Sequence, residues 1–281
     1  MRLGLEAGAH THDLAVEQGV RGVPISIDQL VNDGVDATLA PLRERGLEVC
    51  QIGAFGYNPL STDREAQAKQ TEILEKGIPL AAATGCPYIV FCGGNYHPSG
   101  FGAGDARNFT DEALDEMAAI LAPMLELAEA HGAKLSIEAY LKTAIYSPGR
   151  FLALWERAKS EALVVNIDPT SLYAYWDLWD PTKTVEHVCT ALAGHYGLVH
   201  LKEIGLYEGF HIQSGLTPIG TGPTDWGQVL RLVAPHVPED SWVILEHVLS
   251  ADEGRASLAL LREAAKVQGV ALAYWRSTIH S

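Results

Sequence analysis

The segment KLSIEAY (134–140) joins a short apolar run to an acidic residue at the position where the run ends. Leu135 and Ile137 are typical of a buried strand, whereas Glu138 is of a type that rarely enters a core. The same pattern recurs in three later segments: LVVNIDP (163–169), LVHLKE (198–203) and WVILEH (242–247). We therefore interpret KLSIEAY as a strand in which Glu138, at the end of the apolar run, has a role in common with the polar residues that end the later strands.

Short apolar segments alternate along the chain with longer segments of helical character. We expect eight strands, at 2–7, 22–27, 47–53, 88–94, 134–140, 163–169, 198–203 and 242–247. We expect helices at 28–45, 63–84, 111–131, 149–160, 182–194, 225–235 and 252–268, while the connection THDLAVEQ (11–18) has only a weak helical pattern. Strands that alternate with helices form parallel sheets. The α/β pattern thus predicts one (β/α)8 TIM barrel over residues 1–281, with a doubly wound sheet as the alternative.

The composition, 47% apolar and 20% charged, suits a globular chain with a large core. Binding of nucleic-acid phosphates requires positive charge, whereas the net charge of this chain is −15, so we expect no nucleic-acid partner. The start MRLGLEAGAH lacks the pattern of a signal peptide, and no apolar run reaches the roughly 18 residues of a membrane span. The four cysteines form no C-x-x-C pair and are expected to be buried thiols. These features favour a cytoplasmic protein with no membrane partner.

Four consecutive predicted strands end in Glu138, Asp168, His200 and Glu246. In a parallel barrel the carboxyl ends of the strands meet at one face, and neighbouring strands lie about 4.8 Å apart. Each residue alone has an ordinary explanation, such as a rim acid, a core histidine or a turn-starting Asp-Pro. Together, three carboxylates at one place repel one another unless a cation joins them. The set predicts a site for one divalent metal ion and suits Mn²⁺, Mg²⁺ or Co²⁺.

The motifs SIEAY, NIDPTSLY, VHLKE and ILEH resemble those of the sugar isomerase/epimerase superfamily of xylose-isomerase-like barrels. The segment PIGTGPTDWGQVL (218–230) resembles the glycine-rich stretch of that family, and the order of the ligands is similar to that in inosose isomerases and ketose 3-epimerases. The resemblance implies that Glu138, Asp168, His200 and Glu246 bind one metal ion, and it favours Mn²⁺, with Mg²⁺ or Co²⁺ as alternatives. It also implies an isomerase or epimerase that acts on a sugar, ketose or keto-inositol.

The resemblance further implies that Glu138 and Glu246 form an acid/base pair. One glutamate removes a proton from the carbon beside a carbonyl and the other returns it, through a metal-bound enediolate. Lys202 lies two residues beyond His200 on the same strand face and is a candidate for binding the substrate oxyanion. The family often has a histidine three residues after the aspartate, where this chain has Ser171.

Three further histidines are candidates for contacts with substrate: His10, His97 and His211. His10 in GAHTHD also fits the two-histidine motif of amidohydrolase barrels, but the later strands lack the ligands of that family. His97 in FCGGNYHPSG resembles a position of the endonuclease IV branch, whose extra ligands are missing here. The aromatic loop SLYAYWDLWDP (171–181) suits stacking on a sugar or aglycone, a cover over the site, or a subunit contact.

The favoured function is thus a metal-dependent isomerase or epimerase in carbohydrate metabolism, with a small carbohydrate or polyol as substrate. The alternative is a metal-dependent lyase of the same fold, either an inosose dehydratase or a subunit that cleaves C-glycosides. An endonuclease IV-like nuclease and a non-catalytic binding subunit are less favoured, because of the acidic charge and the intact ligand set. The oligomeric state stays open: a homo-oligomer, or a hetero-oligomer if the chain is a lyase subunit.

Overall fold

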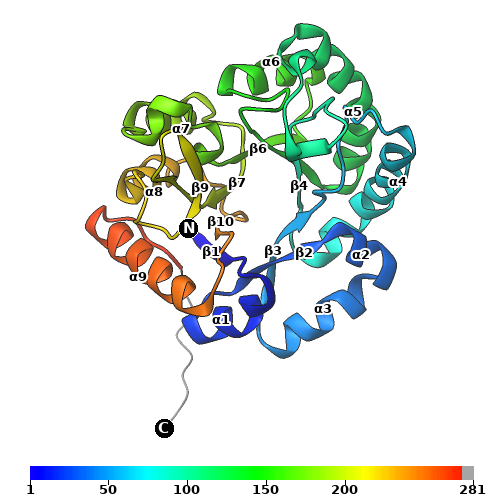
Figure 1. Ribbon diagram of the computed structural model, residues 1–281. Helices are drawn as coiled ribbons and strands as arrows, with labels where there is room; N and C mark the ends of the chain where they lie inside the picture. The colour runs from blue at the N-terminus through cyan, green and yellow to red at the C-terminus, as the bar shows by residue number, and fades with distance from the viewer. Residues whose placement is uncertain (274–281) are drawn as a thin grey trace.

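The computed structural model describes residues 1–273 and shows a closed parallel barrel with helices on its outside (Figure 1). Around the barrel the strands follow the order β1-β10-β7-β6-β5-β4-β3-β2. The barrel strands are β1 (Arg2–Leu5), β2 (Gly22–Ser26), β3 (Glu48–Gly53), β4 (Tyr88–Cys92), β5 (Lys134–Glu138), β6 (Leu163–Ile167), β7 (Tyr196–Leu201) and β10 (Trp242–Leu245). The predicted TIM barrel is confirmed, and the predicted end of the domain, residues 274–281, lies outside the described residues.

The helices α1 to α9 form a ring around the strands (Figure 1). They are α1 (Thr11–Gln18), α2 (Ile27–Asp33), α3 (Val35–Glu44), α4 (Arg64–Ala81), α5 (Asp111–His131), α6 (Pro148–Ala158), α7 (Thr182–Ala191), α8 (Trp226–Val233) and α9 (Ala251–Val267). Short 3₁₀ helices occupy several connections: η1 (Gly8–His10), η2 (Ala82–Thr84), η3 (Gly100–Gly102), η4 (Ala106–Phe109), η5 (Pro169–Leu172) and η6 (Tyr175–Leu178).

The predicted continuous helix over 28–45 is wrong. Gly34 has φ 81° and ψ 166°, which lie outside the helical region, so the chain breaks there into α2 and α3. Only glycine adopts such a conformation without strain, and a glycine within a helical pattern is a common point of interruption. The weak pattern at 11–18 does form a helix, α1, which ends at Gly19 in the left-handed conformation.

Local capping chemistry sets several helix ends. Thr110 accepts a hydrogen bond from the amide of Ala113 at the start of α5, and Gly132 ends that helix with φ 68°. Ser147 caps α6 in the same way, and Pro148 is its first residue. A side-chain oxygen at the cap satisfies an amide that has no partner within the helix. These boundaries follow from residues near them in the chain, so the sequence predicts them well.

A two-stranded antiparallel hairpin, β8 (Glu203–Tyr207) with β9 (Gln213–Thr217), follows β7 and was not predicted. The predicted strand 198–203 runs too far, because β7 ends at Leu201 and Glu203 begins the hairpin. The buried Glu203 carboxylate accepts hydrogen bonds from Thr224 Oγ1 at 2.6 Å and Trp226 Nε1 at 2.8 Å. These bonds join the base of the hairpin to the glycine-rich segment. A Cβ on Gly222 would lie 2.6 Å from the Glu203 side chain, so the close contact requires glycine there.

The four cysteines are buried free thiols, as predicted. Within residues 1–273 no helix has both the length and the apolar character needed to cross a membrane.

Candidate metal centre

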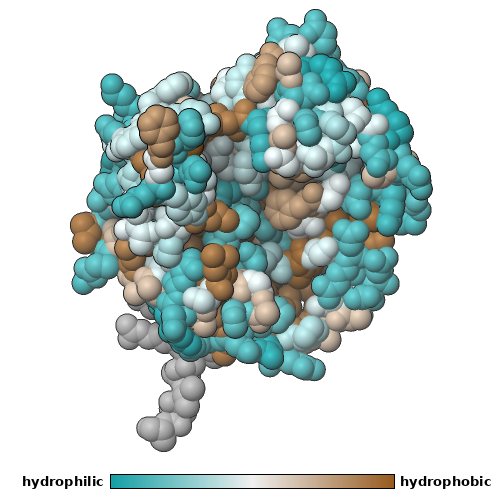
Figure 2. All heavy atoms as spheres, viewed as in Figure 1, coloured by the Kyte–Doolittle hydropathy of each residue, from teal (hydrophilic) through white to brown (hydrophobic). Residues whose placement is uncertain are grey.

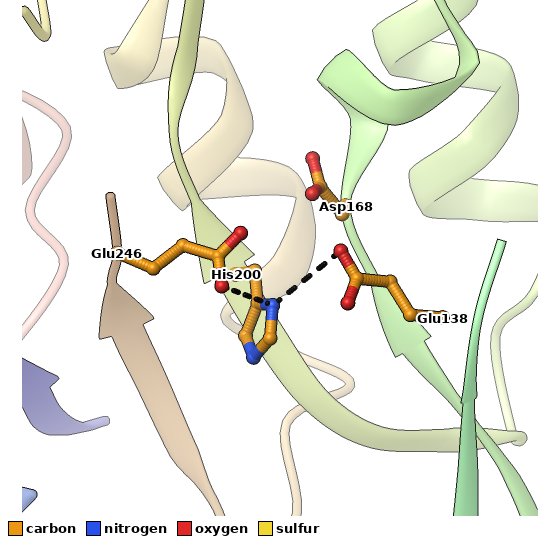
Figure 3. Close-up of side chains that lie close together, drawn as sticks. All are labelled: Glu138, Asp168, His200 and Glu246. Carbon is orange, nitrogen blue, oxygen red and sulfur yellow. Dashed lines mark ion pairs between the residues drawn. The ribbon is translucent and has the colours of Figure 1, made fainter. Parts of the chain in front are cut away.

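Glu138, Asp168, His200 and Glu246 come together at one end of the barrel (Figure 3). One ligand atom from each residue lies within 4.8 Å of the others, and all four side chains are buried. Glu138 is the last residue of β5, His200 lies near the end of β7, and Asp168 and Glu246 directly follow β6 and β10. The sequence-predicted ligands therefore converge, because parallel strands present their carboxyl ends at the same face.

The two ring nitrogens of His200 have different partners. Nε2 lies 2.7 Å from Gln51 Oε1, which belongs to β3 on the opposite side of the barrel. Nδ1 makes no hydrogen bond and faces Glu246 Oε2 at 2.9 Å and Glu138 Oε1 at 3.7 Å (Figure 3). An amide oxygen only accepts, so Nε2 must carry the proton in this pair. Nδ1 is thus the nitrogen that can bind a metal ion.

Lys202 is the buried cation of the site. Its Nζ lies 3.0 Å from Glu138 Oε1 and 2.9 Å from Glu246 Oε1, and it also pairs with Asp168. Tyr140 donates from its hydroxyl to Glu138 Oε1 at 2.8 Å and accepts from Lys202 Nζ at 3.1 Å. Lys202 therefore links the three acidic side chains, consistent with its predicted place beside His200 on the inner strand face.

The charges at the site shift each other's pKa values. Burial alone raises the pKa of the Glu138 carboxyl, but Lys202 and His200 outweigh it and hold that pKa at about 2. For Glu246, burial is likewise outweighed by His200 and Lys202, which hold the pKa at about 2. Burial lowers the pKa of His200, yet Glu246 and Glu138 raise it to about 10. Both glutamates are therefore ionised at neutral pH, and a metal ion that binds Nδ1 must replace a proton there.

The donor set fits a divalent cation. Three carboxylates and one imidazole form an O3N set, which suits Mn²⁺, Mg²⁺ or Co²⁺. The buried His200 Nδ1, which has no hydrogen bond, faces the carboxylate oxygens that would share the ion. Asp168 already accepts from Thr170 Oγ1 at 2.8 Å and from Ser171 Oγ at 2.9 Å, so its carboxylate is held in place. These contacts would orient the candidate ligands before an ion binds.

Replacing Gln51 with Leu is expected to weaken Mn²⁺ binding by about 10- to 100-fold, because the partner that fixes the His200 ring is lost. Isothermal titration of the metal-free protein measures this change. Gln51→Glu keeps an accepting oxygen and should retain affinity within a few fold. Gln67→Leu on the outer helix α4 serves as the matched control. Equal affinities for the Leu variant and the wild type would show that Gln51 has no role in the metal centre.

A cavity of about 570 Å³ opens at this end of the barrel. Figure 2 shows the hollow, with hydrophilic residues inside it and hydrophobic residues at its rim. Of the four metal-ligand candidates, only Glu138 and Glu246 line the cavity, beside Gln51 and Tyr140. The remaining lining residues come mainly from the ends of β1, β2, β3 and β10: Glu6, Pro24, Ile25, Ser26, Asp28, Gly53, Phe55, Gly56 and His247. The two glutamates are thus the ligands that a substrate in the cavity would meet.

None of the three other predicted histidines lines this cavity. His10 is an exposed residue of η1. His97 Nδ1 lies 2.7 Å from Ser99 Oγ, within the connection after β4. His211 is exposed between β8 and β9. Contacts of these side chains with a substrate therefore stay predictions.

The aromatic loop likewise supplies no residue of the cavity wall. Tyr175, Trp176 and Trp179 are exposed, whereas Tyr173 is buried and its hydroxyl lies 3.0 Å from Thr224 Oγ1. Among the three roles predicted for this loop, stacking on a molecule in the cavity therefore has no support from the geometry.

Several residues of the site were not identified from the sequence. Tyr140 carries a usable signal, because it lies two positions after Glu138 and therefore on the same strand face. His247 directly follows the candidate ligand Glu246, and its place in the motif ILEH is a signal that the sequence does carry. Gln51 and Phe55 offer no such signal, since their roles depend on which strands lie opposite each other across the barrel.

Comparison with known proteins matches residues 12–264 to a family model described as a xylose isomerase-like TIM barrel. A structure of such a barrel protein from Mycobacterium smegmatis in complex with magnesium is 17% identical, with a TM-score of 0.67 and coverage of 90% of this chain and 87% of that one. No curated protein matches the chain by sequence.

Two named enzymes are among the similar solved structures. The 3-keto-D-glucoside 4-epimerase YcjR from E. coli is 16% identical, with a TM-score of 0.70 and coverage of 94% of this chain and 99% of that one. The probable 3-DHS dehydratase AsbF from Bacillus anthracis, involved in petrobactin synthesis, is 18% identical, with a TM-score of 0.66 and coverage of 92% and 98%. At these identities the likeness shows a shared fold.

Proposed function

The chain belongs to the xylose isomerase-like TIM barrel family, and from its site we infer that it is a divalent-metal-dependent isomerase or epimerase of a sugar, ketose or keto-inositol. The observation that carries this proposal is that only two of the four buried candidate ligands line the cavity. Glu138 and Glu246 line the cavity, whereas Asp168 and His200 are buried and do not. Two carboxylates that face one cavity from different strands suit the removal and return of a proton.

The proposed roles follow from the contacts. A divalent ion held by Glu138, Asp168, His200 and Glu246 would supply the positive charge that acidifies a C–H bond beside a carbonyl. Glu138 and Glu246 approach His200 Nδ1 from opposite sides (Figure 3), so one carboxylate takes the proton and the other delivers it. Lys202 and Tyr140 hold the Glu138 oxygen and keep it ionised, which is the state a base requires. Lys202 does not line the cavity and already pairs with three acidic side chains, so its predicted contact with a substrate oxyanion would require it to leave one of them.

The cavity favours an uncharged, hydroxyl-rich substrate. Glu6, Asp28, Glu138 and Glu246 contribute carboxylates to its wall, and no arginine among residues 1–273 lines it. Lys202, the buried cation nearby, is engaged by three acidic side chains. A phosphate group would therefore meet repulsion, whereas hydroxyl groups can donate to the carboxylates. The exposed ring of Phe55 in the same wall can pack on the apolar face of a sugar.

Incubation of the metal-loaded protein in D₂O with a panel of ketoses and ketoinositols tests the proposal. Mn²⁺, Mg²⁺ and Co²⁺ are compared, and metal-free protein is the control. We expect deuterium to enter the carbon beside the carbonyl of at least one compound only when the metal is present. Protein that binds no divalent ion, or that exchanges no compound with any of the three ions, would contradict the proposed function.

The lyase alternative is separated by the products of the same experiment. An isomerase or epimerase gives a deuterated isomer of unchanged composition, whereas a dehydratase also releases water and leaves an unsaturated product. The similarity in fold to a probable 3-DHS dehydratase supports the lyase alternative. Mass spectrometry of the product mixture distinguishes the two, because loss of water lowers the product mass.

A further inference from the structure

His247 has an unusual backbone conformation at the edge of the cavity. Among residues 1–273, only Lys159 and His247 are non-glycine residues with positive φ, and His247 has φ 57°. Lys159 lies at the C-terminal cap of α6, where left-handed residues are common. His247 caps no helix but directly follows Glu246 at the end of β10. A strained conformation at such a position is typical of a residue whose side chain must point in a particular direction.

Glu6, which follows the neighbouring strand β1, stabilises the backbone conformation of His247. Its Oε2 accepts from the His247 amide at 3.0 Å, and its Oε1 accepts from the Gly8 amide at 2.8 Å. The backbone amide of Glu6 also donates to the Leu245 carbonyl at 2.7 Å, which joins the ends of β1 and β10. Glu6 thus fixes the backbone on which His247 is carried.

The His247 ring lies where a substrate would meet Glu246. It lines the cavity, and its side chain is 44% exposed. Nε2 is 3.4 Å from Glu246 Oε1, longer than a normal hydrogen bond, and the ring makes no hydrogen bond to any of residues 1–273. Glu246 Oε1 is the oxygen that contacts Lys202, while Oε2 faces His200. Nε2 therefore lies in a long ion-pair contact with Glu246, while Nδ1 has no partner among residues 1–273 and is available to a ligand in the cavity.

Apart from His247, the cavity wall formed by residues 1–273 offers only Ser26 and Gln51 as side chains still able to donate to a substrate. Its four carboxylates only accept when ionised, and the Tyr140 hydroxyl already donates to Glu138. A polyol presents oxygens that need donors as well as acceptors. We propose that His247 binds a substrate hydroxyl next to the carbon at which Glu246 exchanges a proton, and so selects substrates that carry a hydroxyl at that position. This inference rests on the proposed function.

Two variants remove the ring without changing the backbone, since Gly and Asn both tolerate positive φ. The probes are the compound of the panel that exchanges fastest and its monodeoxy derivatives. In His247→Gly we expect kcat/KM for exchange of the parent compound to fall about 10- to 100-fold, the size of one lost hydrogen bond to substrate. His247→Asn keeps a shorter side chain that can donate, so its kcat/KM should fall less. The dissociation constant of the parent compound, measured by titration calorimetry, should rise more in His247→Gly than in His247→Asn.

The decisive measurement is the preference for the parent compound over each deoxy derivative. The wild type should prefer the parent at least about tenfold at one hydroxyl position, and His247→Gly should lose the preference at that position alone. Lys159→Gly, at the other strained residue, is the matched control and should behave like the wild type. Mn²⁺ affinity and the midpoint of thermal unfolding should stay unchanged in His247→Gly.

Three outcomes would overturn the inference. His247→Gly could keep the full preference for the parent compound, or it could lose Mn²⁺ binding in parallel with activity, which would mean a structural role. Both outcomes leave the proposed function intact. A wild-type protein that exchanges no compound of the panel removes the proposed function and this inference together.

Discussion

Glu246→Gln is expected to lower the rate of C–H exchange by about 10²- to 10⁴-fold, even at saturating Mn²⁺. The amide oxygen of Gln can still bind a metal ion, but the amide cannot accept the substrate proton at neutral pH. Glu246 lines the cavity, and His200 and Lys202 keep its pKa at about 2. The loss should therefore appear in kcat and persist when metal occupancy is restored.

Asp168→Asn is the matched comparison for Glu246→Gln. It also removes one negative charge from the ligand set, but Asp168 does not line the cavity and has no proposed part in proton transfer. We expect its exchange activity to recover largely as Mn²⁺ is raised, with metal content followed by atomic absorption. Equal recovery of both variants at full metal occupancy would show that the two-glutamate mechanism is wrong.

Lys202→Met is expected to reduce the free energy of unfolding of the metal-free protein by about 3–5 kcal/mol. The Lys202 ammonium is buried and lies within 3.0 Å of oxygens of Glu138 and Glu246. Without it, the buried carboxylates repel one another, and only His200 remains to balance them. Met has a similar length and is apolar, so the change removes the charge with little change in volume.

A divalent ion should compensate for the missing ammonium. Saturating Mn²⁺ should raise the midpoint of thermal unfolding more in Lys202→Met than in the wild type, since the ion supplies the charge that the lysine provided. Lys266→Met is the control, because its side chain is 78% exposed and its loss should change stability by less than about 0.5 kcal/mol. A metal-free Lys202→Met protein as stable as the wild type would mean that Lys202 does not offset the repulsion among the carboxylates.

The convergence of the four candidate ligands was predictable because barrel geometry converts positions in the chain into positions in space. Each of Glu138, Asp168, His200 and Glu246 lies at or next to the end of its own strand, and parallel strands end at one face. Lys202 followed from the alternation of side chains along a strand. The end of α5 at Gly132 and the N-terminal cap of α6 at Ser147 depend on local capping. All of these depend on residues that are close in the sequence.

The residues that support the ligands could not be predicted in this way. Gln51 and His200 are separated by 149 residues, and their hydrogen bond exists because β3 and β7 face each other across the closed barrel. The hairpin β8–β9 depends on Glu203, whose partners Thr224 and Trp226 lie beyond it in the chain. No local pattern encodes such contacts, because they form only when distant segments are brought together.

The sequence by itself determined the barrel, the order of its strands along the chain and the convergence of Glu138, Asp168, His200 and Glu246 beside Lys202, because periodicity and strand ends are local properties. Only the tertiary structure decided which ligands face the cavity, which nitrogen of His200 is free and how Glu6 holds His247 beside Glu246. Those features depend on closure of the barrel, which brings the end of β1 next to the end of β10. Closure is a long-range event, and its consequences for the site are visible only in the folded chain.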